Sequence, residues 1–180
     1  MIVLRRATRA DAPTLKAWDK EPHVIRATTD DPDADTAFEG IVWEDELAAQ
    51  SDIQRYYIAD LDGRPIGAMQ IMDPHLEPTH YWGDVAPNLR AVDIWIGVAS
   101  ELGKGLGTEM MRLALDICFA DPAVTAVIID PLASNTRAHT FYRRLGFAPV
   151  GRRRFNGEDD CLVHELTRTA WQRRFPPRAS

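Results

Sequence analysis

The chain has 180 residues, of which 45% are apolar, 27% charged and 8% aromatic, and its formal net charge is −6. This length suits one domain with a core of its own, and the composition excludes a disordered chain, a collagen-like repeat and a coiled coil. No run approaches the roughly 18 consecutive apolar residues of a membrane helix, so no membrane partner is expected. The net acidity argues against binding of nucleic acid.

Cysteine content and the first residues indicate a cytoplasmic protein. Cys118 and Cys161 are too few for a disulfide framework and are expected as free thiols in a reducing compartment. The basic residues near the start follow the short apolar run 2–4 instead of preceding it, which is not the order of a signal peptide. We therefore expect a soluble cytoplasmic domain.

Acidic and basic residues are unevenly divided along the chain. Residues 1–100 carry 18 acidic and 9 basic side chains, whereas residues 101–180 carry 9 acidic and 12 basic ones. On these counts alone, ordinary solvated surface charge is the simpler interpretation. The alternative is that the acidic half and the basic half meet partners of opposite charge.

Hydrophobic periodicity and turn signals predict alternating strands and helices, and no internal repeat or linker divides the chain. The first half is expected to contain a strand at 2–4, a helix opening at Asp11, an exposed acidic loop at 28–35, a helix at 36–50, and strands at 55–61 and 65–72 joined by Asp62-Gly63. Residues 73–90 lack periodicity, and such long loops are often functional.

The second half begins with a strand at 91–98 and a glycine-rich turn. After this turn we expect a helix through 110–119, a fully buried strand at 124–129 and a helix from Asn135 to Gly146. The chain then ends with a hairpin of 149–155 and 161–166 across Asn156-Gly157 and a short helix after Arg168. This order predicts an α/β (α+β) fold, in which one mixed, twisted central sheet carries helices on its faces. Residues 1–180 are expected to form a single domain.

The segment 101–108 places glycines at 103, 105 and 107 between a strand and an amphipathic helix. Glycine lets the backbone turn tightly and approach a ligand, and N–H groups at a helix N-terminus attract phosphate oxygens. The spacing matches neither a P-loop nor a Rossmann turn. By itself, such a turn is as compatible with a structural role as with binding of a pyrophosphate.

A second segment, NTRAHTFYRRLGF at 135–147, follows the next strand. Together, the two segments resemble motifs A and B of the GNAT superfamily of acetyl-CoA-dependent N-acetyltransferases, with a motif core at 91–147. Gly105 and Gly107 match the Gly-x-Gly of motif A, whereas Leu102 stands where the family usually has Gln or Arg. The resemblance implies the GNAT fold, whose central sheet is splayed between its fourth and fifth strands.

The resemblance also implies acetyl-CoA as the co-substrate. The pantetheine arm would enter the gap between the splayed strands as an extra strand, and the pyrophosphate would lie on the glycine turn. Asn135 would hydrogen-bond the arm, although an ordinary N-cap role explains this residue equally well. The expected cofactor-binding residues are Ile96, Val98, Gly103, Lys104, Gly105, Gly107, Thr108 and Asn135.

Acyl transfer from a thioester needs a neutral amine and a proton donor for the leaving thiolate. By the family pattern Tyr142 is the general acid, because a phenol with a pKa of about 10 can protonate a thiolate with a pKa of about 8.5. Without that pattern, core packing would explain Tyr142. Asp93 lies in an apolar strand, where a carboxylate is costly unless it is paired or faces a polar site. It would hold the acceptor ammonium and take its proton; a solvent-facing position or an internal ion pair is the alternative.

Further segments narrow the resemblance to the aminoglycoside 6′-N-acetyltransferases. They are 62–67, Tyr81-Trp82, 90–93, 99–108, 119–125 and 129–131, within a match that spans about 55–150. By this resemblance Asp93 matches a carboxylate thought to act as the base, and Asp130 matches one that binds the aminoglycoside. A turn role beside Pro131 is the alternative for Asp130. Leu102 is shared with part of this branch.

A small polycationic amine suits acidic residues and an aromatic floor. The loop at 73–90 supplies both kinds of residue, and the loop at 28–35 supplies further acids. Trp82 is expected to stack on a sugar ring of the substrate, with a position in the core as the alternative. The scattered His23, His75 and His80 lack metal-ligand spacing, so no metal site is expected.

Two other functions stay open at this point. One is a GNAT enzyme that acetylates a lysine or hydroxylysine siderophore precursor or a peptide or protein amine, and its groove would be more apolar. The other is a non-catalytic acyl-CoA-binding module, against which the presence of both Asp93 and Tyr142 argues. The chain is expected to be a monomer or a homodimer.

Overall fold

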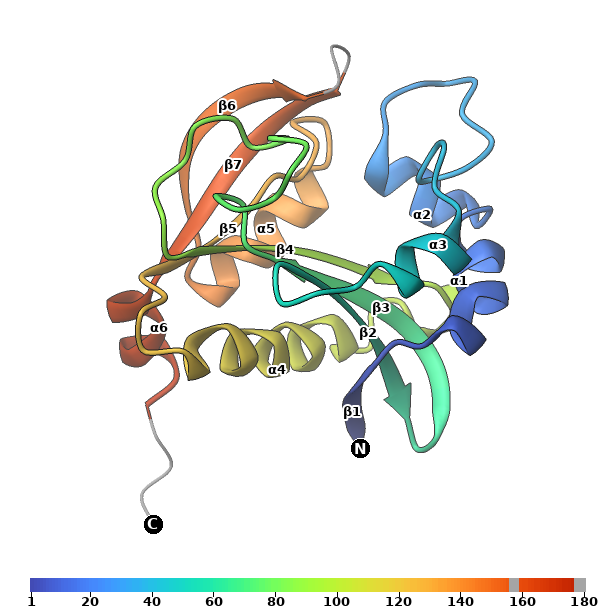
Figure 1. The fold of residues 1–180 in the computed structure, drawn as a ribbon, viewed down its shortest axis with the longest axis horizontal. Helices are drawn as coiled ribbons and strands as arrows, with labels where there is room; N and C mark the ends of the chain where they lie inside the picture. The colour runs from blue at the N-terminus through green and yellow to red at the C-terminus, as the bar shows by residue number, and fades with distance from the viewer. Residues whose placement is uncertain (156–158, 177–180) are drawn as a thin grey trace.

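The computed structural model describes residues 1–155 and 159–176, and its centre is a seven-stranded sheet in the order β1-β2-β3-β4-β5-β7-β6 (Figure 1). The strands are β1 (Ile2–Arg6), β2 (Gln54–Leu61), β3 (Arg64–Met72), β4 (Leu89–Ile96), β5 (Ala126–Ile129), β6 (Ala148–Phe155) and β7 (Asp159–Thr167). The helices are α1 (Ala12–Trp18), α2 (Pro22–Thr28), α3 (Trp43–Ala48), α4 (Leu106–Ala120), α5 (Thr136–Leu145) and α6 (Arg168–Arg174), with short 3-10 helices η1 (Arg9–Asp11) and η2 (Ala99–Glu101).

Strands β1 to β4 form an antiparallel meander. The β2–β3 connection is the predicted Asp62-Gly63 turn, and both residues have positive φ, at 51° and 81°. Two consecutive positive φ values give a turn whose twist matches that of the flanking strands. This local signal explains why the hairpin could be read from the sequence.

Strands β4 and β5 run parallel but stay together only briefly. Their register extends from Leu89 opposite Ala126 to Ala91 opposite Ile128, whereas β4 continues to Ile96. Beyond Ala91, the edge of β4 that faces β5 is therefore left without a strand partner, and the sheet opens into a wedge. This confirms the predicted splay between the fourth and fifth strands.

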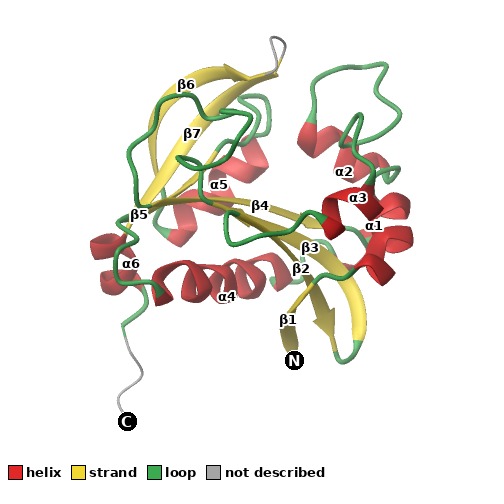
Figure 2. Cartoon of the chain, viewed as in Figure 1, coloured by secondary structure: helices red, strands yellow, loops and turns green. Residues whose placement is uncertain are grey.

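Helices cover both faces of the sheet (Figure 2), and each face has its own core. Helix α4 packs its apolar side on one face, whereas α1, α2 and α3 cover the other around Trp18, Trp43 and Trp95. Gly97 makes this second contact possible, because a Cβ built there would lie only 2.0 Å from the Trp18 ring. The N-terminal helices are thus packed directly against the end of β4.

The N-terminal third differs most from the sequence prediction. The helix expected at 36–50 is confined to α3, because Gly40 adopts φ 77° and Phe38 turns away to pack on Trp43 and Trp95. Helix α2 was not expected. Asp11 precedes α1 as predicted, but its carboxylate binds the Arg5 guanidinium and the Thr8 backbone N–H instead of capping that helix.

The C-terminal elements follow the prediction closely. Strand β5 is buried along its whole length, α5 ends at Gly146 with φ 98°, and α6 follows β7 directly. The expected hairpin turn at Asn156-Gly157 lies outside the described residues. Among the residues that the structure describes, none of the helices has the length and apolar character needed to span a bilayer.

Candidate active site

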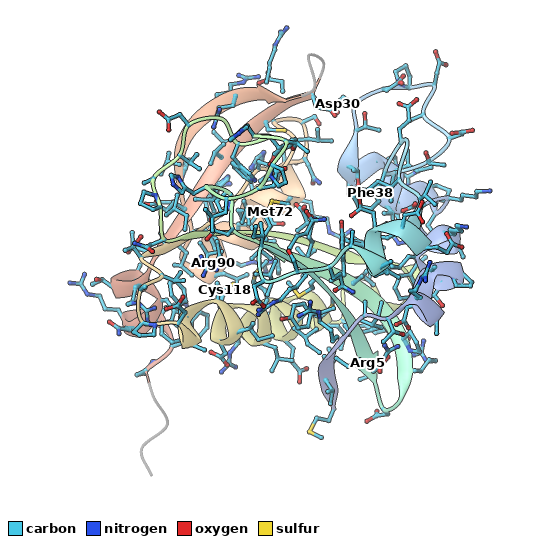
Figure 3. The ribbon with its side chains drawn as sticks, viewed as in Figure 1. Arg5, Asp30, Phe38, Met72, Arg90 and Cys118 are labelled. Carbon is cyan, nitrogen blue, oxygen red and sulfur yellow. The ribbon has the colours of Figure 1, made fainter. Side chains whose placement is uncertain are left out.

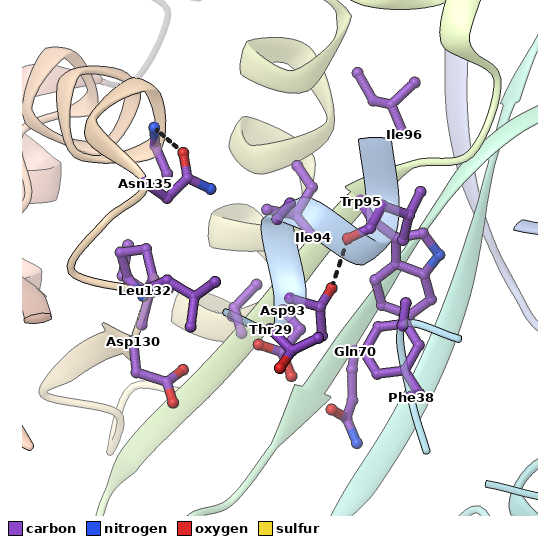
Figure 4. A pocket seen from close by; sticks show the side chains of 18 of the residues that line it. Thr29, Phe38, Gln70, Asp93, Ile94, Trp95, Ile96, Asp130, Leu132 and Asn135 are labelled. Atoms are coloured by element: carbon purple, nitrogen blue, oxygen red, sulfur yellow. Dashed lines mark hydrogen bonds between the residues drawn. The ribbon is translucent and has the colours of Figure 1, made fainter. Parts of the chain in front are cut away.

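A cleft of about 1670 Å³ opens where β4 and β5 diverge. Its walls come from α2 and the loop after it, from β2 to β4, from the turn before α4, and from the loop between β5 and α5 together with α5 itself. Figure 4 shows Asp93 and Asp130 in this cleft, with Ile96 and Asn135 further along it. Tyr142 also lines the cleft, so the sequence-predicted catalytic residues lie in one cavity.

The glycine turn forms one end of the cleft. Gly103 and Gly105 have φ values of 77° and 82°, in the left-handed region that favours glycine. A Cβ built on either residue would meet no atom within 4 Å, so the space above the turn is open. Gly107 and Thr108 belong to the first turn of α4, where backbone N–H groups have no partners within the helix. The turn therefore offers N–H donors at the positive end of a helix dipole.

Lys104 contributes less to this end than the sequence indicated. It is absent from the residues that line the cleft, and its Nζ lies 3.0 Å from Glu101 Oε2. Arg64 binds the other oxygen of the same buried carboxylate at 2.6 Å. The Lys104 charge is thus balanced within the protein, and the expectation that it contacts the cofactor finds no support in its position.

The two strand residues expected to hold the cofactor have different environments. Ile96 lines the cleft, whereas Val98 packs against the aromatic cluster of the N-terminal helices. The Val98 backbone N–H donates a 3.2 Å hydrogen bond to the Ile66 carbonyl oxygen. The chain bends back toward β3 after Ile96, and Val98 is not among the residues that line the cleft, so its contact with the cofactor stays a prediction that its position does not support.

Asn135 has the N-cap role that was one of its two expected roles, and its contact with the cofactor stays a prediction. Its Oδ1 accepts a 3.0 Å hydrogen bond from the Ala138 backbone N–H, which is an N-cap interaction. The side chain also lines the cleft, close to the gap between the splayed strands (Figure 4). Capping fixes the orientation of the amide and leaves its nitrogen as a donor for a ligand.

Asp93 and Asp130 form an electrostatically coupled pair of carboxylates. Asp93 is open to the water in the cleft, but the surrounding protein desolvates it and raises its pKa to about 6. Burial, reinforced by repulsion from Asp93, raises the pKa of Asp130 as well. The Tyr81 hydroxyl donates a 2.7 Å hydrogen bond to Asp130 Oδ2, which favours the ionised form. The pair is poised to take up a proton or a cation.

Tyr142 lies two helical turns after Asn135, on the same side of α5. Its ring packs near Phe147 and His164, with centroids 5.8 Å and 6.2 Å away. Burial, together with the negative charges of the two aspartates, raises the pKa of the phenol. Tyr142 is therefore protonated at neutral pH and can act as a proton donor.

Helix α2 and the residues after it close the cleft from above. His23 Nε2 lies 2.7 Å from the carbonyl oxygen of Ile96 and donates to it, which joins α2 to β4. At the other end of the helix, Ser134 Oγ donates a 2.6 Å hydrogen bond to Asp30 Oδ1. Asp30 stands on the N-terminal side of the gap that faces the β6–β7 hairpin (Figure 3). This segment therefore connects β4 to the loop after β5 and forms one wall of the cleft.

Residues 7–155 match the sequence profile of the family described as acetyltransferase (GNAT) domain. The chain belongs to the GNAT acetyltransferase family. It is 33% identical over 154 residues to aminoglycoside N(6′)-acetyltransferase type 1 of Klebsiella pneumoniae, an alignment that covers 83% of this chain and 75% of the relative. It is also 40% identical over 77 residues to a kanamycin resistance protein of Rhizobium radiobacter, covering 42% of this chain and 71% of that protein.

Solved structures give the same picture of this GNAT domain. The crystal structure of aminoglycoside acetyltransferase AAC(6′)-Ib in complex with coenzyme A and kanamycin has a TM-score of 0.80 and 30% identity, and covers 96% of this chain and 98% of that one. The AAC(6′)-Ib complex with ribostamycin and coenzyme A has a TM-score of 0.82 and 30% identity, with 99% and 98% covered. The predicted family and the predicted fold are both confirmed.

The aromatic residue on the acceptor side of this GNAT cleft is not the one expected. Trp82 is 3% exposed and packs under β5 and β7 with Ile128 and Val163, so the prediction that it stacks on a substrate ring was wrong. Its neighbour Tyr81 lines the cleft instead. Positive φ values at His80 and Gly83 turn the chain on either side of this pair, and as a result Tyr81 faces the cleft whereas Trp82 faces the core.

The N-terminal wall of the GNAT cleft adds Tyr56 and Gln70, which the sequence did not single out, to the acidic loop that it did. The Tyr56 hydroxyl accepts a 2.9 Å hydrogen bond from Gln70 Nε2 and donates one of 3.2 Å to Glu46 Oε2. Gln70 is the β3 neighbour of Asp93 across the strand pair. Acidic residues of the loop after α2, namely Asp31, Asp33 and Asp35, also line the cleft.

Proposed function

We propose that this GNAT domain transfers the acetyl group of acetyl-CoA to an amine of an aminoglycoside, the 6′-amine, and thereby confers resistance. One observation carries the proposal: a coupled carboxylate pair and a protonated buried tyrosine share the cleft that opens at the glycine turn. Relatives that align over most of the chain bear the same activity in their names. We propose that residues 1–180 act together as one catalytic domain.

The residues at the splay fit the co-substrate. Gly103, Gly105 and the first turn of α4 offer open space and N–H donors for a pyrophosphate. Beyond Ala91, the edge of β4 has no strand partner among the described residues and offers backbone groups to an extended amide-bearing arm, next to the Ile96 carbonyl that His23 already contacts. Asn135 adds a fixed side-chain donor beside it. Acetyl-CoA would supply the thioester, and these residues would orient it toward Asp93.

The acceptor side suits a cationic amine. Asp93 and Asp130 attract an ammonium group, which in turn favours their ionised forms. Asp93 then takes one proton from that ammonium, directly or through a water molecule, and leaves a neutral amine that can attack the thioester. Tyr142 donates its hydroxyl proton to the departing sulfur, the second proton that the nitrogen loses as the amide forms restores the phenol, and the proton on Asp93 passes to water. Removal of one positive charge from the product weakens its attraction to RNA phosphates.

The acidic lining favours this acceptor over the alternatives. Carboxylates from several separate parts of the chain line the cleft, among them the loop after α2, α3, the loop after β3, β4, the end of β5 and the start of β7. A groove for a siderophore lysine or a peptide would bury more apolar surface. Tyr81 adds an aromatic face next to Asp130, which suits a sugar ring that carries amines.

Release of the CoA thiol across a panel of aminoglycosides tests the proposal directly. We expect turnover with kanamycin- and tobramycin-type acceptors and none with a lysine derivative. Tyr142→Phe is expected to lower kcat roughly 10²-fold or more, the usual contribution of a general acid, while acetyl-CoA binding is kept. Tyr57→Phe, a core tyrosine outside the cleft, is the matched control. Turnover on the lysine derivative alone would refute the substrate assignment.

A further inference from the structure

The C-terminal helix α6 adds charged and aromatic residues at the edge of the cleft. Arg174 and Phe175 are cleft-lining residues at the end of α6, and Arg144 at the end of α5 lines the same corner. The family match ends at residue 155, so α6 lies outside the part of the chain that the family shares. This corner, made of Arg112, Arg144, Arg174 and Phe175, has no role in the chemistry described above.

The corner is held together by direct contacts among its members. Arg174 Nη2 donates a 3.2 Å hydrogen bond to the backbone oxygen of Arg144. The Phe175 ring has the Arg174 guanidinium 5.9 Å from its centroid and that of Arg112 at 5.3 Å. Helix α6 is anchored to α4 by the stacked rings of Trp171 and Phe119, 4.7 Å apart (Figure 1 shows the two helices together). The guanidinium groups are thus placed on a packed scaffold.

Within the described part of the chain, none of the three guanidinium groups of this corner forms an ion pair. Arg174 uses one of the five N–H donors of a guanidinium, so further donors are left for a ligand. Lys104, at the glycine turn, is instead held by Glu101. The α6 corner is therefore one place in the cleft where guanidinium groups have no carboxylate partner among the described residues, and Arg137 at the start of α5 is another.

Arg144, Arg174 and Phe175 line the same cleft as the glycine turn, and Arg112 extends the corner along α4. Arg112 is seven residues after Gly105, about two turns along α4, and side chains on a helix point back toward its N-terminus. A ligand whose pyrophosphate lies on the turn would carry its nucleoside along this side of α4. CoA has a phosphomonoester on the ribose 3′ position and an adenine ring, which match the guanidinium groups and the Phe175 face respectively.

We propose that Arg174 and Phe175, with Arg144 and Arg112, bind the 3′-phosphoadenosine end of the acyl-CoA, so that the C-terminal helix selects the 3′-phosphorylated cofactor. The inference rests on the proposed function, because it assumes that the cleft takes a CoA thioester. A polycationic acceptor would be repelled by this corner, which leaves the anionic end of the cofactor as its ligand. Arg174 and Phe175 are here specificity residues and take no part in proton transfer.

Calorimetric titration of the full chain with CoA and with 3′-dephospho-CoA tests this assignment without any turnover. We expect the protein to bind CoA about tenfold more tightly, with a ratio that shrinks as salt is added. Arg174→Gln is expected to weaken CoA binding to the level of dephospho-CoA and to leave dephospho-CoA binding unchanged. Arg173→Gln removes the neighbouring charge outside the cleft and is expected to change neither value.

A second variant tests the adenine contact separately. Phe175→Leu is expected to weaken CoA and dephospho-CoA binding by the same several-fold factor and to leave binding of 4′-phosphopantetheine unchanged. Equal affinity of the wild type for CoA and dephospho-CoA would overturn the assignment while leaving the proposed function intact. So would an equal loss for both ligands in Arg174→Gln. Absence of binding by all three ligands would instead overturn the proposed function together with this inference.

Discussion

The hydroxyl of Tyr81 donates a 2.7 Å hydrogen bond to Oδ2 of Asp130. Tyr81 comes from the long loop after β3, and Asp130 follows β5, so the bond joins the acceptor loop to the rim of the splay. Burial and the nearby Asp93 favour the protonated form of Asp130, whereas the tyrosine favours the ionised form. Tyr81 therefore keeps a partly buried carboxylate available for a cation.

Removal of this hydroxyl is expected to weaken acceptor binding selectively. In Tyr81→Phe the pKa of Asp130 rises further, and less of it is ionised near neutral pH. Hydrogen bonds to charged groups contribute about 1.5–3 kcal/mol, so KM for kanamycin should rise by about tenfold or more. KM for acetyl-CoA should be unchanged. Steady-state kinetics at pH 7.5 measure both, and an unchanged KM for kanamycin would remove Tyr81 from the acceptor site.

The elevated pKa of Asp93 predicts an acidic limb in the pH–rate profile. A general base must be ionised, and the pKa of Asp93 is raised to about 6, so kcat/KM should rise with slope one as pH increases through about 6. An unperturbed aspartate would place this limb near pH 4. A bound cationic acceptor favours ionisation, so the limb in kcat should lie at lower pH than the limb in kcat/KM.

Variants assign that limb to one residue. Asp93→Asn should abolish it and lower turnover roughly 10²-fold or more, because the amide cannot accept the proton. Asp84→Asn makes the same charge change on an exposed residue outside the cleft and should keep the limb. A limb that persists in Asp93→Asn would show that another group acts as the base.

The parts of the site that are local in sequence were predictable. The glycine turn follows from residues that tolerate positive φ, and the N-cap at Asn135 follows from a side chain suited to that role. Asp93 could be assigned to the cleft because side chains alternate along β4. In each case, the signal lies within a few residues of the position concerned.

The remaining features depend on contacts between distant residues. Helix α2 has only seven residues, and its stability comes from tertiary contacts such as His23 on Ile96, 73 positions away. The facing of Tyr81 and Trp82 is set by backbone turns in an irregular loop, where no periodicity distinguishes one neighbour from the other. The ion pair between Lys104 and Glu101 could not be predicted from their spacing of three residues alone, because it is the fold that buries the Glu101 side chain.

Asp130 is expected to lower the stability of the ligand-free protein at alkaline pH. The pKa of Asp130 is raised to about 8 in the folded protein, above the unfolded value near 4. The folded state therefore binds more protons between these two pH values, and the free energy of unfolding falls as pH rises from about 4 to about 8. Asp130→Asn keeps an acceptor for the Tyr81 hydroxyl and removes the charge. At pH 8 it should raise Tm by about 2–4 °C, corresponding to about 1 kcal/mol in a domain of this size.

At pH 4 the same variant should change Tm little, because Asp130 is protonated in the folded wild type. Asp160→Asn is the opposite control, since Arg152 lowers the pKa of the Asp160 carboxylate and the charge is favourable in the folded state. That variant should give no gain at pH 8. Differential scanning calorimetry across the pH range distinguishes the two. A Tm gain for Asp130→Asn that is equal at pH 4 and pH 8 would contradict a charge effect.

Gly105 and Gly107 are expected to be required for different reasons, the first because of its positive φ and the second as a residue inside helix α4. Gly105 has φ 82°, so Gly105→Ala forces a left-handed alanine that costs about 1–2 kcal/mol, and Tm should fall by several degrees. CoA affinity should fall with it, because the donors of the turn are displaced. Gly107 lies inside α4 with ordinary helical φ, and a Cβ there would meet Phe141 at 3.7 Å, a normal contact. Gly107→Ala should therefore keep or slightly raise Tm. Equal losses of Tm in both variants would show that crowding, and not positive φ, sets the requirement for glycine in this turn.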